Sequence, residues 1–439
     1  MDLLIFSETL SPRLEYVFNH IFVKQLGLKI GFTTKINDFI KSDKPKFSYS
    51  KLSISDSIFF QAHSLLYESD IIKQNINLSV YKKNPIFFLS SNNKSALPFD
   101  PFAATFYMLS RYEEYLPYKK DRFSRFPASE SLAFKNNFLK KPVVDKWIIL
   151  IKEVLIKAYP NLNFRPHNFT YLNTIDVDNA FAYLEKGIFR TIGALSRSII
   201  QFNFMDFVDR LAVLFLLKKD PYDTYEKLLA IHKKYNLKTI IFFLLANYGR
   251  LDRNVSSKSI KYQSMIQYLK RFFDIGIHAS YSSNWNLKKL NLEIKRLSNI
   301  VKEKITKNRQ HYLVLNLPYS YQNLIANNIS EDYSMGFPAE PGFRAGTSHS
   351  FSFFNLHDNT ATNLLIHPFC VMDVTLMNYL KLKPEKAFSV IKLLIDEVKN
   401  VNGCFISIWH NESFQDSMQF NKWHNVYEDM IRYALDEKN

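Results

Sequence analysis

Two aspartates separated by a single residue are the clearest chemical feature of this sequence. Asp176 and Asp178 stand in TIDVDNAF, at the end of an apolar run. Because side chains alternate along a strand, both carboxylates would point to the same side. Two like charges so close together favour a cationic partner beside them. The simpler alternative is that the pair caps the backbone amides of a turn.

Basic side chains end other runs that have the pattern of strands. His278 ends IGIHAS, Arg309 and His311 lie in KNRQHYL, and His410 follows CFISIW. In parallel α/β folds, reactive groups gather at the carboxyl ends of strands. One carboxylate with two imidazoles is a common ligand set for Zn²⁺ or a similar divalent ion, and the other carboxylate could then act as a base. Structural hydrogen bonds near the strand ends are the alternative role for each side chain.

Composition narrows the classes of function. The chain has 439 residues, of which 47% are hydrophobic, so we expect two or three domains with large cores. Its 10 glycines never fall at the spacing of a phosphate-binding loop, and its two cysteines form no CxxC pair. The net charge of +16 is spread along the chain. We therefore expect a solvated basic surface rather than a membrane or polyanion role, and we expect no nucleic-acid partner.

The sequence also bears on location. No apolar run reaches the roughly 18–20 residues that span a bilayer, and no basic segment precedes the first apolar residues as it would in a secretory signal. A cytoplasmic protein is therefore expected. Residues 188–219 mix basic and apolar side chains in a long insertion. An amphipathic helix that covers the fold is the commoner structure for such a segment, and a lid or a peripheral contact with the inner face of the membrane is the alternative.

The order of elements predicts an α/β protein with two units. Residues 1–165 read as a mixed α/β domain, in which Asp100 and Pro101 begin a helix. Two prolines and three asparagines in 160–168 indicate a linker. In residues 166–439 strands alternate with helices, which predicts parallel strands with helical crossovers. Seven such strands suggest a closed or nearly closed barrel.

The ordered set TIDVD, GIHASY, NRQHYL and ISIWHN resembles the polysaccharide deacetylase family, also called carbohydrate esterase family 4. The resemblance covers roughly residues 168–439 and implies a distorted (β/α)7 barrel. The stretch LPFDPFAATFYMLSRYEEYLP resembles the N-terminal domain that precedes such barrels in some bacterial proteins.

The resemblance implies a role for each motif residue. Asp176 would be the general base, held ionised by Arg309. Asp178 and His278 would bind the metal. His410 matches the late histidine that protonates the leaving amine. Metal and base would together activate a water molecule that attacks an N-acetyl carbonyl.

Two positions need separate treatment. The second histidine of the family's HxxxH segment is replaced here by Ser282. We take His311 as the third metal ligand, although His367 or no third ligand remain alternatives. In GFRAG, Arg344 lies between two glycines in an expected loop, where it could contact an anionic part of a substrate.

The expected function is that of a metal-dependent hydrolase that removes N-acetyl groups from a sugar of a bacterial glycan or glycan precursor. Its cofactor would be a divalent ion such as Zn²⁺ or Co²⁺, and its partner an N-acetylated glycan. The alternative is a catalytically inactive barrel that serves as a glycan-binding or envelope-assembly module, which the serine at position 282 favours.

Overall fold

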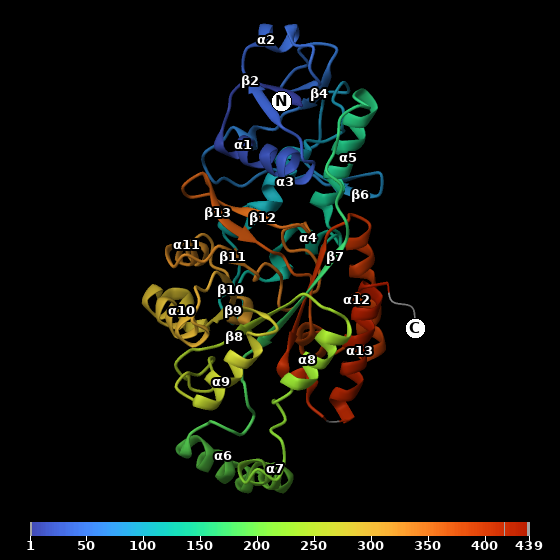
Figure 1. Ribbon diagram of the computed structural model, residues 1–439. Helices are drawn as coiled ribbons and strands as arrows, with labels where there is room; N and C mark the ends of the chain where they lie inside the picture. Colours follow the sequence, from blue (N-terminus) through green and yellow to red (C-terminus); the bar gives the residue numbers. More distant parts are fainter. Residues whose placement is uncertain (1, 417, 437–439) are drawn as a thin grey trace.

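The computed structural model describes residues 2–416 and 418–436. Two sheets dominate it, one wholly parallel and one mainly parallel. The smaller sheet lies at one end of the molecule, near the N-terminus (Figure 1). Its strands are all parallel. In sheet order they are β2 (Ile30–Thr33), β1 (Leu3–Ser7), β3 (Lys46–Ser50) and β4 (Ile58–Gln61). A separate two-stranded hairpin consists of β5 (Ser79–Tyr81) and β6 (Asn84–Ile86).

The helices of the N-terminal unit are α1 (Pro12–Phe18), α2 (Ile36–Lys41), α3 (Pro101–Leu109), α4 (Leu132–Lys135) and α5 (Val143–Ala158). Aromatic side chains form the core where α1 and α3 meet β3 of the smaller sheet. The predicted helix start is confirmed, since Asp100 caps α3 and Pro101 is its first residue. Phe102 of α3 stacks on Phe18 with ring centroids 4.4 Å apart, and both rings are fully buried. This stacking helps to hold α3 in place.

The larger sheet carries the predicted motifs. In sheet order its strands are β12 (Phe351–Asn355), β13 (Thr360–Ile366), β11 (Glu331–Asp332), β10 (Lys307–Gln310), β9 (Asp274–Ala279), β8 (Thr239–Phe243), β7 (Thr170–Val177), β15 (Cys404–His410) and β14 (Val371–Met372). All neighbours are parallel except β12, which runs antiparallel to β13. The carboxyl ends of β9, β10, β7 and β15 therefore lie at one edge of the sheet.

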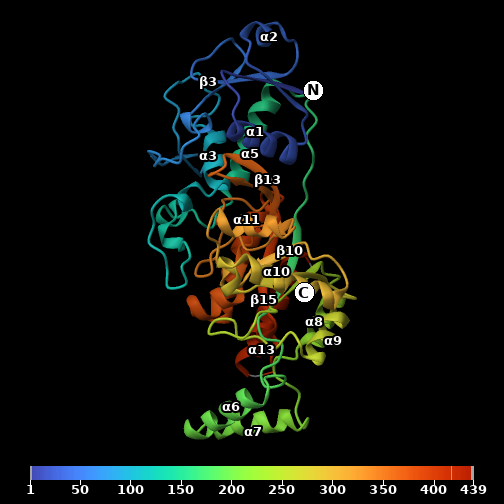
Figure 2. The same cartoon turned by 90° about the vertical axis from the view of Figure 1, so that its left-hand side faces the viewer.

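Helices connect and cover these strands. They are α6 (Ile188–Ile200), α7 (Phe204–Leu214), α8 (Tyr225–Lys234), α9 (Ile260–Leu269), α10 (Leu287–Val301), α11 (Tyr319–Ala326), α12 (Pro384–Lys399) and α13 (Met418–Ala434). Figures 1 and 2 show α8, α9 and α10 beside the sheet, and α6 and α7 apart from it at the far end of the molecule. Within the described part of the chain, no helix has the length and apolar character needed to cross a bilayer.

Alternation along the strands gives the larger sheet two different faces. Ile241 and Phe243 of β8 join the main core under the helices, whereas Ile240 and Phe242 face a second, smaller core with Leu172 of β7. Thr174 and Asp176 follow Leu172 at two-residue spacing, so they lie on this inner face.

The expected parallel sheet with helical crossovers is confirmed, but its closure into a barrel is not. A large, mainly parallel sheet with helical crossovers is present. Its edge strands are β12 and β14, and no ladder joins them within the described residues. Closure into a (β/α)7 barrel is therefore not established. The antiparallel β12 was not anticipated from the sequence, because a hairpin partner beside a βα unit has no local signature of its own.

The N-terminal unit is packed firmly onto the larger sheet. Tyr16 of α1 donates a hydrogen bond to the Ser352 carbonyl in β12 at 2.7 Å, and Phe106 of α3 contacts the ring of Phe354 at 5.1 Å. The predicted linker has no helix or strand between 160 and 168, although Arg165 is tied back by its N–H to the Leu26 carbonyl. The two sheets fall on either side of it; the domain boundary itself remains a prediction.

Candidate metal centre

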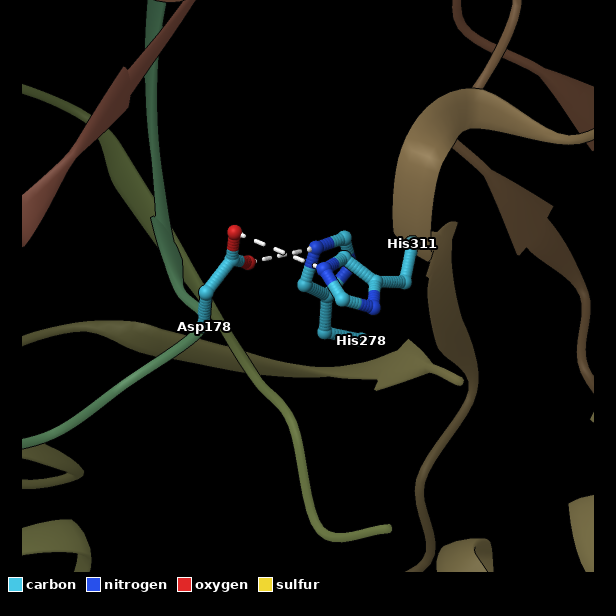
Figure 3. Close-up of side chains that lie close together, drawn as sticks. All are labelled: Asp178, His278 and His311. Atoms are coloured by element: carbon cyan, nitrogen blue, oxygen red, sulfur yellow. Dashed lines mark ion pairs between the residues drawn. The ribbon is translucent and has the colours of Figure 1, made fainter. Parts of the chain in front are cut away.

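Three of the predicted ligands meet at the carboxyl ends of neighbouring strands. Asp178 directly follows β7, His278 lies near the end of β9, and His311 directly follows β10. The Oδ1 atom of Asp178 is 3.0 Å from Nε2 of His278, and its Oδ2 is 3.5 Å from Nε2 of His311 (Figure 3). One ligand atom from each residue lies within 4.8 Å of the others. This cluster could bind a metal ion.

The tautomers of the two imidazoles are set by what lies behind them. Nδ1 of His278 is 2.9 Å from the carbonyl oxygen of Arg309, which can only accept. Nδ1 of His311 is 2.9 Å from a carboxylate oxygen of Asp252. Both Nδ1 atoms therefore carry hydrogen, and in the neutral imidazole each Nε2 presents a lone pair to Asp178. Carboxylate and carbonyl partners of this kind are typical behind metal-bound histidines.

A cation fits this arrangement on its own chemical terms. The Oδ1 atom of Asp178 is buried and accepts no hydrogen bond from the described residues, although His278 Nε2 is in contact with it. Lone pairs that face one another repel unless a proton or a metal ion lies between them. Nitrogen and oxygen donors in this ratio suit Zn²⁺ and related ions.

The pKa values of Asp178 and His311 are shifted by the same close contacts. Desolvation would raise the pKa of Asp178, but the facing imidazoles outweigh it and hold that pKa well below its usual range. Burial would lower the pKa of His311, but the carboxylates of Asp178 and Asp252 raise it to about 9. Without another cation, protons are drawn to the place that a metal ion would occupy.

The second carboxylate is paired with the arginine that the family resemblance implied. Oδ1 of Asp176 pairs with the Arg309 guanidinium at 2.7 Å, and both side chains are almost fully buried. The guanidinium also lies 4.5 Å from the ring centroid of Phe242. A Cβ at position 276 would come within 2.4 Å of that ring, so Gly276 is needed for the ring to support Arg309. The free oxygen of Asp176 is 3.8 Å from His278 Nε2, beside the metal cluster.

His410 completes the group from the end of β15. Its Nδ1 is 2.7 Å from Oδ1 of Asp373. The other carboxylate oxygen of Asp373, Oδ2, accepts a hydrogen bond from the backbone N–H of His410. Its Nε2 is 3.9 Å from Asp178. Burial would lower the pKa of His410, but Asp373 outweighs it and raises the pKa to about 10. His410 therefore holds a proton that it can donate toward the cavity.

A cavity of about 230 Å³ opens over these residues. Asp176, Asp178 and His410 line it, together with Tyr312 and with Arg125 from the N-terminal unit. The arginine is positioned by an ion pair with Asp121 and by a hydrogen bond to the carbonyl of Tyr312 at 2.8 Å. The N-terminal unit therefore forms part of the cavity wall, which the sequence did not indicate.

Ser282 is not part of the ligand cluster but supports it through Asp252. The backbone N–H of Ser282 donates to Oδ2 of Asp252 at 3.1 Å, and Asp252 in turn orients His311. The alternative ligand His367 lies elsewhere, stacked on Tyr333 with its Nδ1 2.7 Å from the hydroxyl of Ser350. His311 thus occupies the third position of the cluster.

The prediction for Arg344 requires correction. Its side chain is 1% exposed and forms a bidentate ion pair with Glu114 of the N-terminal unit, at 2.8 and 2.6 Å. A guanidinium committed to a buried carboxylate cannot also reach a substrate in the cavity. Arg344 fastens the two units together. The expected loop is present, since residues 342–346 form a turn in which Gly342 and Gly346 have positive φ, but the N-terminal unit covers it.

Sequence reasoning missed the two carboxylates that orient the histidines. Asp373 ends the apolar run FCVM, and this was a usable signal because other chemical residues also end strands. Asp252 lies in the irregular segment between β8 and α9 and carried no such signal.

Comparisons with known proteins add limited information. Residues 3–160 match a family of unknown function, DUF7033. No curated protein matches the chain. Solved structures that resemble it include a candidate polysaccharide deacetylase from Mycobacterium smegmatis, 13% identical over 61% of this chain and 85% of that chain, with a TM-score of 0.38.

Two further likenesses are of the same kind. One is a pseudoenzyme of the CE4 family from Bacillus anthracis, 9% identical over 61% of this chain and 62% of that chain, with a TM-score of 0.29. The other is a Puue allantoinase, 9% identical over 62% of this chain and 94% of that chain, with a TM-score of 0.37. At such identities and TM-scores these likenesses establish nothing about the chemistry of this chain.

Proposed function

We propose that this protein is a metal-dependent amidohydrolase that removes the N-acetyl group from a sugar of a bacterial glycan or glycan precursor, within a distorted (β/α)7 barrel. One observation carries the proposal: two imidazole lone pairs and a carboxylate converge on one point beside a second carboxylate that an arginine holds. The motif resemblance supplies the reaction class.

The residues divide into three tasks. Asp178, His278 and His311 would hold a divalent ion, with zinc or cobalt the expected species. When bound, the ion would act as a Lewis acid on the amide carbonyl and would lower the pKa of water at the site.

The second carboxylate would accept a proton. Arg309 keeps one oxygen of Asp176 occupied and directs the other toward the cluster. This geometry leaves a single oxygen of Asp176 to receive the proton that an attacking water loses. The desolvation cost of burying Asp176 and Arg309 offsets much of their attraction, so the ion pair adds little to the stability of the fold. The pair instead holds Asp176 in one orientation, which a general base requires.

The protonated imidazole of His410 would complete the reaction. Cleavage of the amide requires a proton on the departing nitrogen, and His410 can supply one from Nε2 while Asp373 stabilises the imidazolium through Nδ1. An amide rather than an ester is expected as substrate because an amine is the poorer leaving group, so that this acid has most effect there.

The test combines metal content with acetate release from N-acetylglucosamine oligomers. We expect about one bound ion per chain, lost in Asp178→Asn because the anionic ligand is removed. Asp176→Asn should keep the ion but lose at least about 10³-fold in kcat. Asp274→Asn, an exposed change at the opposite end of β9, is the matched control and should alter neither. Unchanged metal content in Asp178→Asn, or full activity in Asp176→Asn, would overturn the proposal.

The same measurements distinguish the proposed hydrolase from the alternative, a glycan-binding module without catalytic activity. It requires oligomer binding with no acetate release from metal-loaded protein. The serine at position 282 favours this alternative from the sequence, but His311 fills the place in the cluster that this serine leaves without a ligand.

A further inference from the structure

The insertion between β7 and α8 is a helical hairpin that projects away from the rest of the molecule. Figures 1 and 2 both show α6 and α7 together at the end of the molecule farthest from the N-terminal sheet. The hairpin leaves the sheet immediately beyond the end of β7 that carries Asp176 and Asp178. Arg190 fixes its base, since the guanidinium lies 3.9 Å from the ring centroid of Tyr248 and donates to the Asn254 carbonyl.

The hairpin shows large apolar side chains to its surroundings. Exposed fractions of 74–93% are found on both helices, on the turn between them and after α7; the most exposed include Phe189, Ile200, Phe202, Met205, Leu216 and Leu217. With the less exposed Ile192 and Val208 included, apolar side chains recur along each helix at spacings of three and four, which makes one apolar face. A face of this size is unusual on a protein surface in water.

The contact between the two helices includes a cluster of polar groups. Oδ2 of Asp206 accepts a hydrogen bond from the buried hydroxyl of Ser198 at 2.5 Å, and Oδ1 accepts from Tyr183 at 3.0 Å. Arg210 pairs with the same carboxylate. These polar groups lie inside the hairpin together with the buried Val213, while large apolar side chains are left exposed on its outside. Exposed apolar side chains of this size suit surroundings that are themselves apolar.

The hairpin also carries a net positive charge. Residues 186–219 contain six lysines and arginines and two aspartates. Both aspartates are neutralised within the hairpin, Asp206 by Arg210 and Asp209 by Lys218. The remaining positive charge, including the exposed Arg197 in α6, complements anionic lipid headgroups.

We propose that the α6–α7 hairpin docks the protein on an anionic lipid bilayer, with its apolar side chains at the boundary between headgroups and acyl chains. Helices of this length and pattern lie in the plane of the interface rather than across it. The strand ends that carry the metal cluster would then be held near the membrane. The proposal stands on the hairpin alone and does not depend on the proposed function.

The test measures co-sedimentation of the full chain with phosphatidylcholine vesicles, with and without phosphatidylglycerol. We expect binding that requires phosphatidylglycerol and that weakens by at least about tenfold in the triple variant Phe189→Ser, Phe202→Ser, Leu217→Ser. These side chains are exposed, so their loss should not unfold the protein. Arg197→Glu should also weaken binding to the vesicles that contain phosphatidylglycerol.

Two controls separate docking by the hairpin from a general effect of lost apolar side chains and from damage to the metal cluster. The matched variant Leu52→Ser, Ile72→Ser, Val80→Ser removes exposed apolar side chains from the N-terminal unit and should bind as the wild type does. Metal content should be equal in all variants. Unchanged sedimentation of the hairpin variant would overturn the proposal. So would a wild-type protein that ignores vesicles but forms dimers which the hairpin variant loses.

Discussion

Two carboxylates, one in each unit, have opposite surroundings. Asp100 in the N-terminal unit is 2% exposed and accepts four hydrogen bonds. Its donors are the backbone N–H groups of Phe102, Ala103 and His63 and the hydroxyl of Tyr49, at 2.7–3.0 Å. Asp178 in the larger unit also has a buried Oδ1, but no donor among residues 2–416 and 418–436 satisfies it, and imidazole Nε2 atoms face its two oxygens.

The difference distinguishes a structural acid from a chemical one. Asp100 is saturated, and although hydrogen bonds oppose the effect, burial raises its pKa to about 6. Asp178 is unsaturated, and the facing imidazoles hold its pKa well below its usual range. A carboxylate that stays ionised and lacks hydrogen-bond donors needs a cation, whereas a saturated one does not.

Removing each acid should therefore damage a different property, and the largest effect should follow Asp100→Ala. We expect the free energy of unfolding to fall by about 2–4 kcal/mol, since a helix cap is lost and buried N–H groups are left unpaired. Metal content should not change. In metal-free buffer, Asp178→Ala should alter the unfolding free energy by less than about 1 kcal/mol. Chemical denaturation measures both, and equal losses would contradict the distinction.

Acid pH gives a second reading of Asp100. Its pKa is about 6 in the folded protein and 3.8 as a free side chain, so between these values the folded state binds a proton that the unfolded state lacks. The contribution of Asp100 to stability therefore rises as pH falls from about 7 to about 4. The gap between the wild type and Asp100→Ala should widen over that range. A gap that narrows would show that Asp100 stays ionised.

A smaller effect should sharpen the comparison inside the site. Asp252 lies behind a metal ligand, whereas Asp373 lies behind the proton donor. Asp252→Asn should weaken metal affinity by about 10–100-fold, because the charge that fixes the His311 tautomer is lost. Asp373→Asn should leave metal affinity unchanged and lower kcat. Competition with a chelator measures the affinity, and equal loss of affinity in both variants would remove the division of roles.

The smallest effect is expected at position 282. Ser282 holds Asp252 through its backbone N–H, which any residue other than proline would supply. Ser282→Ala should leave metal affinity and acetate release within about twofold of the wild type. A larger loss would mean that the hydroxyl takes part in metal binding, and Ser282→Pro tests the backbone contribution itself.

Much of the site was accessible from the sequence because strand ends are local features. Asp178, His278 and His311 each end a run of alternating or apolar residues, and parallel pairing then brings those ends together. The pairing of Asp176 with Arg309 was implied by the resemblance to the polysaccharide deacetylase family instead, and the structure shows it. Arg344 was misjudged because a sequence shows which residues could form a loop but not what covers that loop.

By itself the sequence determined which chemical groups are present and the order along the chain of the strands that carry them. It also determined the two-residue alternation that places Asp176 on the inner face. Each of these features depends on residues that are adjacent in the chain. Only the tertiary structure decided which carboxylate stands behind each imidazole, because Asp252 and His311 are 59 residues apart and Asp373 and His410 are 37 apart. Contacts over such separations depend on how whole elements pack, and packing responds to shape and burial that no local pattern records.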